Sequence, residues 1–474
     1  MTFNSYTFII FFSIILALHY SPLNWQFKKI NLLIASYIFY AAWHPPFVIL
    51  LLICTLADWF AGKGVASSDT IGKRRFFLGI ALCVNLGMLA FFKYANFLME
   101  NFVWMTSIFS IQYQPLKLDI VLPLGISFFT FQSLTYTLDI YKRKAGPWPS
   151  FLDFALFVSF FPKLAIGPIT RAFVFLPQCP NPTKIDASKM AWGFFLLILG
   201  LFEKVIMSDS LLAPVADLLF NKAGTPNTVS AWTGSLAFTG QIFFDFAGYS
   251  TCAIGVALCL GFTLPQNFKY PYAAIGFSDF WRRWHISLSS WLRDYLYISL
   301  GGNKKGNART YINLMLTMLL GGLWHGASWT FIAWGALHGL FLVIERFLKS
   351  IIPESHVWAK LPVQLFFALI TFIAISIAWI FFRADSFGQA FTIIAAMLTL
   401  TSDLPNLRIE SFYIPLTFSI TGAILISHWI MRERSLEVII GKMPWWLRGI
   451  VMAVLMIIIV TCSGEDRAFI YFQF

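Results

Sequence analysis

The chain has 474 residues, of which 58% are hydrophobic and only 12% are charged, and its formal net charge is +12. So large an apolar excess cannot be enclosed by a polar surface, which excludes a water-soluble globular protein and indicates an integral membrane protein. The basic residues are scattered over short loops. This distribution argues against nucleic-acid binding and is typical of the cytoplasmic loops and lipid contacts of membrane proteins.

Apolar runs of the length that a helix needs to cross a bilayer recur along the chain, and we count about 11 to 13 of them, with additional re-entrant or interfacial helices. The first run, Tyr6 to Leu18, lacks a preceding basic segment and a following small-residue cleavage site, so it is predicted to be a retained helix. The six cysteines show neither a disulfide framework nor a metal-binding spacing, and no metal is expected. The sequence therefore predicts an all-α polytopic membrane protein.

The middle of the chain differs from its flanks, because residues 120–345 mix Gly, Pro, His, Arg and Asp into apolar sequence. Broken helices and polar groups at membrane depth are tolerated only where protein or a water-filled cavity satisfies them. We therefore expect one membrane domain over residues 1–474, with its core at 120–345. Residues 1–119 and 346–465 would be scaffold helices, followed by an aromatic tail at 466–474.

Three stretches show this mixture of polar or helix-breaking residues with apolar sequence. "LPLGISFFTFQSLTYTLDIYKRK" (122–144) and "FFPKLAIGPITR" (160–171) combine Pro, Gly and charge with apolar sequence, which favours kinked or re-entrant elements around a cavity. "QIFFDFAGYS" (241–250) places Asp245 in an apolar run. Because an unpaired buried carboxylate is costly, Asp245 is expected to have a cationic or hydroxyl partner.

The segment "FSDFWRRWHISLSSWLRDYLYISLGG" (277–302) is predicted to form one helix, capped by Ser278 or Asp279, with an aromatic side and a cationic side. The glycine pair at 301–302 would end it. Two interpretations remain open. The helix lies in the interface, with Trp and Arg at lipid headgroups, or it lines a polar opening in which the neighbouring arginines favour a neutral His285.

The segment from Tyr311 to Ile344 has no formally charged side chain, yet it contains "LLGGLWHGASW", with His325, and also His338. As one helix it would extend about 50 Å, too long for a single crossing, so it must break, and the glycines around His325 mark the place. We expect His325 near a helix end and treat this intramembrane imidazole as a functional candidate. His338 is expected to be a hydrogen-bonded core residue.

Several common catalytic motifs are absent. The sequence has no GxSxG, GxxxxGK[ST] or HExxH motif, and no aspartate lies five residues after a histidine. Serine-hydrolase, ATP-driven and zinc-hydrolase functions therefore lack sequence support.

Two long motifs, "FSDFWRRWHISLSSWLRDYLYISLGGN" and "NLMLTMLLGGLWHGASWTFIAWGALHG", resemble the membrane-bound O-acyltransferase (MBOAT) family, in the bacterial branch that acetylates alginate and peptidoglycan. The shorter stretches "LLIASYIFYAAW", "FFKYANF", "FFDFAGYS" and "FIYFQF" extend the resemblance over nearly the whole chain. The resemblance implies helices around a central tunnel in the cell inner membrane. It also implies that acetyl from cytoplasmic acetyl-CoA reaches an envelope polysaccharide, through an extracytoplasmic esterase-like partner.

The same resemblance suggests catalytic roles. His325, in the "WHG" motif, would be the general base or acyl-relay residue, and His285 would support it. The aromatic C-terminal motif suggests that Tyr471 accepts the acyl group as a relay, with an aromatic belt at the last helix end as the alternative. Differences from the family pattern, such as "LAIGPI" at 164–169, leave the acceptor open among alginate, peptidoglycan, cellulose and other envelope glycans.

Candidates for binding the phosphates and thioester of acetyl-CoA are Arg282, Arg283, Arg293, Trp324 and Ser289, although lipid headgroups would explain the arginines equally well. Two alternatives to acetyl transfer remain. Intramembrane His and Arg with broken helices would also suit a transporter or flippase, and an acyltransferase of this kind could use another donor, such as a D-alanyl group or a longer chain.

Overall fold

All the regular secondary structure of the described residues is helical, with no β-strand, which confirms the predicted all-α class. By its internal contacts the chain forms two compact units, Met1–Leu197 with Cys252–Pro265 and Ile198–Thr251 with Gln266–Phe474. Helices α10 (Ala187–Leu201) and α12 (Thr228–Cys259) each contribute to both units. The computed structural model describes residues 1–111, 113, 115–116, 118–181, 184–222, 224–352, 356–399, 407–462 and 467–470.

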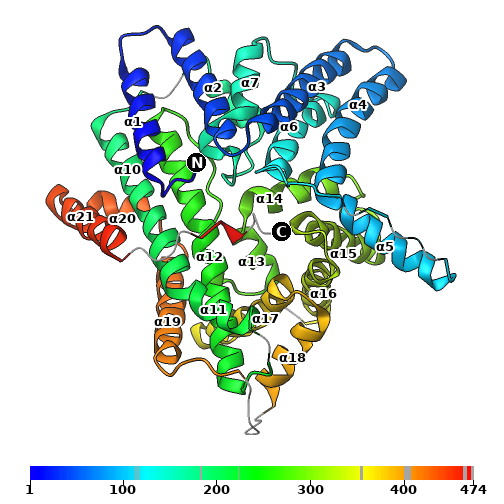
Figure 1. Cartoon of the computed structure of the whole chain (residues 1–474), viewed down its shortest axis with the longest axis vertical. Helices are drawn as coiled ribbons and strands as arrows, with labels where there is room; N and C mark the ends of the chain where they lie inside the picture. The colour runs from blue at the N-terminus through cyan, green and yellow to red at the C-terminus, as the bar shows by residue number, and fades with distance from the viewer. Residues whose placement is uncertain are drawn as a thin grey trace. The chain divides into compact units, whose positions relative to one another are not determined.

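The first unit contains the helices of the N-terminal part of the chain, drawn from blue to cyan-green in Figure 1. Polar side chains begin several of them. For example, the Asn24 side chain accepts a hydrogen bond from the Phe27 N–H, as a helix N-cap does. Besides part of α10 and of α12, the helices are α1 (Tyr6–Tyr20), α2 (Trp25–Ala41), α3 (Val48–Ser67), α4 (Ile71–Leu89), α5 (Ala95–Ile108), α6 (Ile126–Tyr141), α7 (Phe151–Ser159), α8 (Phe161–Leu164) and α9 (Ala172–Phe175).

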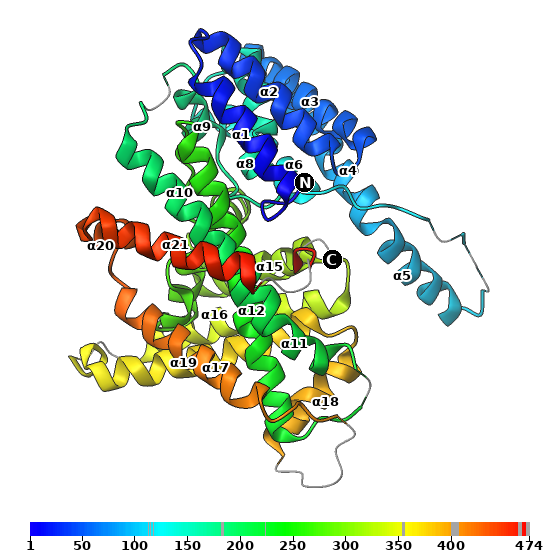
Figure 2. The same ribbon diagram turned by 60° about the vertical axis from the view of Figure 1, so that its left-hand side comes forward.

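A buried carboxylate joins three helices of this unit, α3, α4 and α6, which lie side by side in Figures 1 and 2. Asp58 of α3 accepts hydrogen bonds from Asn85 Nδ2 at 2.7 Å, Ser133 Oγ at 2.6 Å and Thr137 Oγ1 at 2.5 Å. Because a fully buried carboxylate needs such partners, this contact fixes the relative positions of the three helices.

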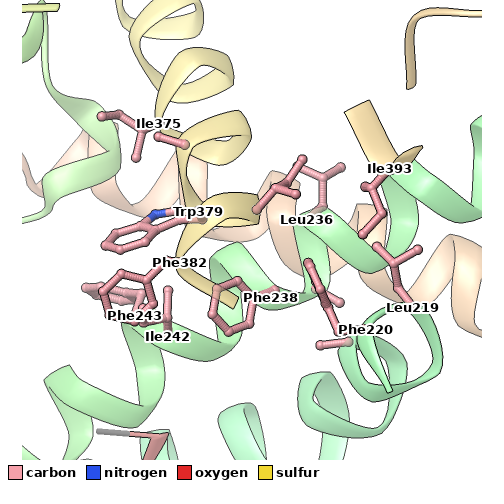
Figure 3. Packing of buried hydrophobic residues seen from close by; sticks show 14 of the residues in the cluster. Leu219, Phe220, Leu236, Phe238, Ile242, Phe243, Ile375, Trp379, Phe382 and Ile393 are labelled. Carbon is pink, nitrogen blue, oxygen red and sulfur yellow. The ribbon is translucent and has the colours of Figure 1, made fainter. Parts of the chain in front are cut away.

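The second unit has a core formed by helices from distant parts of the chain. Figure 3 shows side chains of α11 and α12, such as Phe220 and Phe238, with Trp379 and Phe382 of α17 and Ile393 of α18, all within one buried cluster. Besides part of α10 and of α12, the helices are α11 (Ala213–Phe220), α13 (Phe277–Arg283), α14 (Ile286–Trp291), α15 (Gly306–His325), α16 (Trp329–Ile351), α17 (Leu361–Arg383), α18 (Phe387–Leu398), α19 (Tyr413–Met431), α20 (Leu436–Lys442) and α21 (Trp445–Thr461).

Seven shorter elements complete the described secondary structure. Three of them are π-helical and widen or interrupt longer helices: η2 (Ala90–Tyr94), η4 (Phe202–Leu212) and η6 (Leu292–Tyr297). The others are single 3₁₀ turns: η1 (Pro45–Phe47), η3 (Leu176–Gln178), η5 (Pro271–Ala273) and η7 (His356–Ala359).

The chain is a multi-pass membrane protein. The described residues form seven helices long and apolar enough to cross a membrane, or eight if the bent pair α20 and α21 counts as one span. This number is below the 11 to 13 spans expected, because some apolar runs form helices too short to cross, such as α1 and α18. Another run, Ile71–Ile108, is continuous over 38 residues. Many apolar side chains on these helices are exposed, as lipid-facing side chains are.

Candidate functional site

The hairpin of α15 and α16 carries the first candidate residue at its turn. His325 is the last residue of α15, and α16 begins four residues later, where the Ser328 side chain accepts a hydrogen bond from the Thr330 N–H. This confirms the predicted break in the long uncharged segment. The break lies at Gly326, in extended backbone, whereas Gly321 and Gly322 remain helical.

Two glycines let the helices of this hairpin approach closely. A Cβ atom on Gly322 would lie 2.3 Å from the Phe331 carbonyl oxygen, and one on Gly335 would lie 2.4 Å from the Met318 carbonyl oxygen. No side chain fits at such distances, so the glycines are required for close packing rather than for backbone freedom. This packing fixes the position of His325 at the end of α15.

The His325 ring lies in an aromatic environment and is only 3% exposed. The ring centroids of Trp324 and Trp334 are 4.9 and 5.0 Å away, and that of Phe382 is 5.4 Å away. The centroid of the His285 ring is 6.5 Å from that of His325. The structure thus brings together the two histidines and Trp324, which the sequence singled out separately.

His285 occupies a break between helices, so the prediction of one continuous helix over 277–302 is wrong. The segment divides into α13, α14 and η6, because His285 has the left-handed backbone angles φ 43° and ψ 53°. The predicted caps also differ, since α13 begins at Phe277 and places Ser278 and Asp279 inside its first turn. The predicted end is close, because the glycine pair at 301–302, with positive φ, follows shortly after η6.

Asn267 holds this unusual backbone in place. Its side-chain oxygen lies 3.1 Å from His285 Nδ1 and accepts a hydrogen bond from Ser287 Oγ at 2.9 Å. Its carbonyl accepts the Ile286 N–H at 2.9 Å. A non-glycine residue in this region costs about 1–2 kcal/mol and persists only where the surroundings enforce it, often at functional sites. Asn267 was not among the candidates, because nothing in the local sequence links it to His285.

His285 is neutral, as predicted, although the physical cause differs from the predicted one. His285 lies outside the candidate membrane-spanning helices and is fully buried. Burial lowers its pKa to about 3, so the imidazole is neutral at physiological pH. The predicted cause was repulsion by neighbouring arginines, whereas removal from water is sufficient.

Arg283 takes part in a network that holds α13. Its guanidinium donates to the carboxylates of Asp279 and Glu433, both at 2.9 Å, and to the carbonyl oxygens of Lys269 and Arg432. Most of its donor groups therefore face acceptors of the protein itself. This arrangement orients the helix that precedes His285.

The other residues proposed to bind acetyl-CoA differ from Arg283 in their exposure and in their contacts. Arg282 and Arg293 are exposed, and Arg293 pairs with the adjacent Asp294 at 2.7 Å. Ser289 is partly buried and donates to the Trp284 carbonyl at 3.1 Å. The Trp324 ring lies beside both histidines, with ring centroids 6.1 Å from His285 and 4.9 Å from His325.

His338 was predicted to be a buried, hydrogen-bonded core residue. It is fully buried, but the predicted hydrogen bond is missing among the described residues. Its ring packs against Trp334 at 4.5 Å and Trp281 at 5.0 Å, and neither ring nitrogen has a hydrogen-bond partner among the described residues. Its stabilisation comes from aromatic packing.

Asp245 has the cationic partner that the sequence predicted. Lys204 Nζ lies 2.5 Å from Asp245 Oδ1 and 2.8 Å from Asp209 Oδ1. The Asp245 side chain also accepts the Ile470 N–H at 2.8 Å, which places the C-terminal segment beside α12. Tyr471, the proposed acyl relay, lies outside the described residues.

Comparisons with known proteins agree on one family. The model of the membrane-bound O-acyltransferase family matches residues 70–382, which include both histidines. The probable alginate O-acetylase AlgI of Azotobacter vinelandii is 41% identical over 423 residues, covering 87% of this chain and 82% of that protein. A peptidoglycan O-acetyltransferase of Helicobacter pylori is 38% identical over 405 residues, covering 80% and 75%. A teichoic acid D-alanyltransferase of Streptococcus thermophilus is 31% identical over 239 residues, covering 47% and 56%.

Proposed function

The chain belongs to the membrane-bound O-acyltransferase family, and from this premise we propose that it transfers acetyl from cytoplasmic acetyl-CoA to an envelope polysaccharide. The observation that carries the proposal is the placement of His325 at the break of the α15–α16 hairpin. There it is enclosed by aromatic rings, and the neutral His285 is its neighbour at 6.5 Å between ring centroids.

This arrangement suits acyl transfer to a hydroxyl group. The His325 imidazole takes the proton of the attacking hydroxyl group while the hydroxyl oxygen forms a bond to the thioester carbonyl carbon. The carbon–sulfur bond then breaks, and the CoA thiolate leaves and receives a proton. A site enclosed by Trp324, Trp334 and Phe382 limits hydrolysis, because it keeps bulk water from the thioester.

The comparisons favour acetyl over D-alanyl as the transferred group. The alginate and peptidoglycan O-acetyltransferases match most of this chain at about 40% identity, whereas the D-alanyltransferase matches less than half of it at 31%. The acceptor is accordingly an envelope polysaccharide of the alginate or peptidoglycan class. The two relatives are named for alginate and for peptidoglycan. We therefore place the protein in the inner membrane and assign delivery of acetyl to the polysaccharide to an extracytoplasmic, esterase-like partner.

A cavity of about 370 Å³ at the far end of the hairpin offers a docking place for the anionic donor. Its lining includes Ser278, Tyr311, Arg346 and Lys349. Arg282 follows Ser278 by four residues on α13 and therefore lies on the same helix face. Glu345 also lines the cavity and pairs with Lys349, so the cations proposed to meet the phosphates of CoA are Arg346 and Arg282. The cavity thus adds Arg346 to the arginines selected from the sequence.

The proposal is tested by the turnover of acetyl-CoA. We expect the purified protein in lipid nanodiscs to release CoA from acetyl-CoA slowly, and faster when the esterase-like partner and a polysaccharide acceptor or its oligosaccharide are added together. Released thiol and acetylated product are measured in parallel. Uptake of a solute into vesicles without any thioester turnover would instead support the transporter alternative.

We also propose Tyr471 as the acyl relay, on the ground that the segment just before it is buried beside the site. The Phe469 ring packs on Phe246 at 5.7 Å, and Phe246 packs on His285 at 4.6 Å. Replacing Tyr471 with phenylalanine keeps the ring and removes the nucleophilic oxygen. We expect the transfer of acetyl to the acceptor to fall by roughly a hundredfold or more. Full transfer by Tyr471→Phe would exclude the relay, leaving direct attack by the acceptor.

A further inference from the structure

The C-terminal segment is bound to the second unit by charged groups that the mechanism above does not use. The described part of this segment, residues 467–470, includes Phe469 and Ile470, which are 3% and 5% exposed. Residues 467–469 have no regular secondary structure, so specific contacts must hold them in place. Two sets of contacts do so here.

The first set is the buried triad of Lys204, Asp209 and Asp245. Lys204 and Asp209 are five residues apart in the π-helical segment η4, and hydrogen bonds from residue i to i+5 bring such positions together. The Lys204 ammonium contacts both carboxylates, at 2.8 Å for Asp209 and 2.5 Å for Asp245. It also donates to the Arg467 carbonyl at 3.4 Å, while Asp245 accepts the Ile470 N–H at 2.8 Å.

The second set holds the Arg467 side chain. Its guanidinium pairs with the carboxylate of Asp217 in α11. Arg383 of α17 approaches the other oxygen of this carboxylate at 3.3 Å and also donates to Asn221 at 2.7 Å. Asp217 is thus oriented by one arginine of the scaffold while it binds the arginine of the C-terminal segment.

These contacts determine what lies next to His285. Asp245, Phe246 and Tyr249 occupy one turn of α12, and the Phe469 ring packs on Phe246 at 5.7 Å and on Tyr249 at 5.8 Å. Phe246 in turn packs edge-on against the His285 ring at 4.6 Å. The turn of α12 that binds the backbone of the C-terminal segment therefore also carries the aromatic contact to the site.

We infer that Lys204, Asp217 and Asp245 form a C-terminal clamp, a set of positioning residues that fixes residues 467–470 against the histidine site. Residue Asp245 is decisive in the clamp, because its carboxylate binds the backbone of the segment directly. The functional consequence rests on the proposed acetyl transfer, since the clamp would set the position from which the end of the chain acts at His285 and His325.

The chain offers matched variants for testing the clamp. Asp245→Ala and Asp209→Ala each remove one carboxylate from the triad, and each leaves Lys204 paired with the other aspartate. Only Asp245→Ala removes the acceptor for the Ile470 N–H. Asp245→Asn keeps an oxygen that can accept this hydrogen bond and serves as the conservative variant.

Trypsin gives a readout that does not depend on activity, because cleavage after Arg467 releases residues 468–474. The full-length protein in detergent is treated with limiting trypsin, and the released peptide is measured by mass spectrometry. We expect Asp245→Ala to release it about tenfold faster than the unmodified protein, since accessibility to protease follows local opening. Asp209→Ala and Asp245→Asn should both stay close to the unmodified rate.

The same preparations are assayed for acetyl transfer, which should fall in Asp245→Ala in parallel with release of the peptide. Equal cleavage of Asp245→Ala and unmodified protein would overturn the clamp. So would equally fast cleavage of Asp209→Ala, which would indicate general loosening of the triad. Equally fast cleavage of Asp245→Asn would also overturn it, because the acceptor oxygen would be present and yet would not hold the segment. If acetyl transfer were absent from the unmodified protein, the proposed function would fail while the cleavage result still decided the clamp.

Discussion

Replacement of His325 by phenylalanine should reduce acetyl transfer by about three orders of magnitude, the scale of a lost general base. The substitution preserves an aromatic ring among Trp324, Trp334 and Phe382, so the packing of the hairpin should largely survive. The measurement is the initial rate of acetylated product with saturating acetyl-CoA, normalised to folded protein. The loss should appear in kcat, because the imidazole acts on the attacking hydroxyl and not on donor binding.

His338→Phe is the matched control for this experiment. It makes the same change in the same aromatic cluster, at a histidine whose ring nitrogens have no hydrogen-bond partner among the described residues. Removing polar atoms that are buried without partners should not destabilise the protein, so its acetyl transfer should remain within a few-fold of the unmodified rate. Comparable rates for the two variants would remove His325 from the mechanism.

The break at His325 could be predicted from the sequence because it follows from length and composition alone. An uncharged segment from Tyr311 to Ile344 is too long for one crossing, and its glycines indicate where it turns. The membrane environment makes such a prediction reliable, since every backbone group there must be satisfied within a helix or by protein. The structure places the turn one residue after His325.

The break at His285 could not be predicted in the same way. The local sequence suits a continuous amphipathic helix, and the left-handed residue is imposed by Asn267, which lies 18 positions earlier. Similarly, the cost of burying Asp245 predicted a cationic partner, but not its identity. Lys204 lies far away in the sequence and meets Asp209 through the register of a π-helical segment, which apolar periodicity does not reveal.

Because α15 and α16 pack so closely, replacement of Gly335 by alanine should have the second large effect, a loss of protein stability. The added Cβ would lie 2.4 Å from the Met318 carbonyl oxygen, which is backbone and cannot move aside without the helix. The two helices must therefore separate, although alanine itself favours a helix over glycine by about 1 kcal/mol. We expect net destabilisation by about 2 kcal/mol or more, measured as a lowered midpoint of thermal unfolding in detergent.

The Gly335→Ala protein that remains folded should also lose acetyl-transfer activity, because Gly335 adjoins Trp334, whose ring packs on His325 at 5.0 Å. A displacement of about 1 Å at a catalytic group can cost roughly a hundredfold in rate. Gly422→Ala in α19 is the matched control, since a Cβ there would meet nothing within 4 Å, and it should be neutral or slightly stabilising. If Gly335→Ala unfolded at the same temperature as Gly422→Ala, the glycine contact would not be what positions His325 at the end of α15.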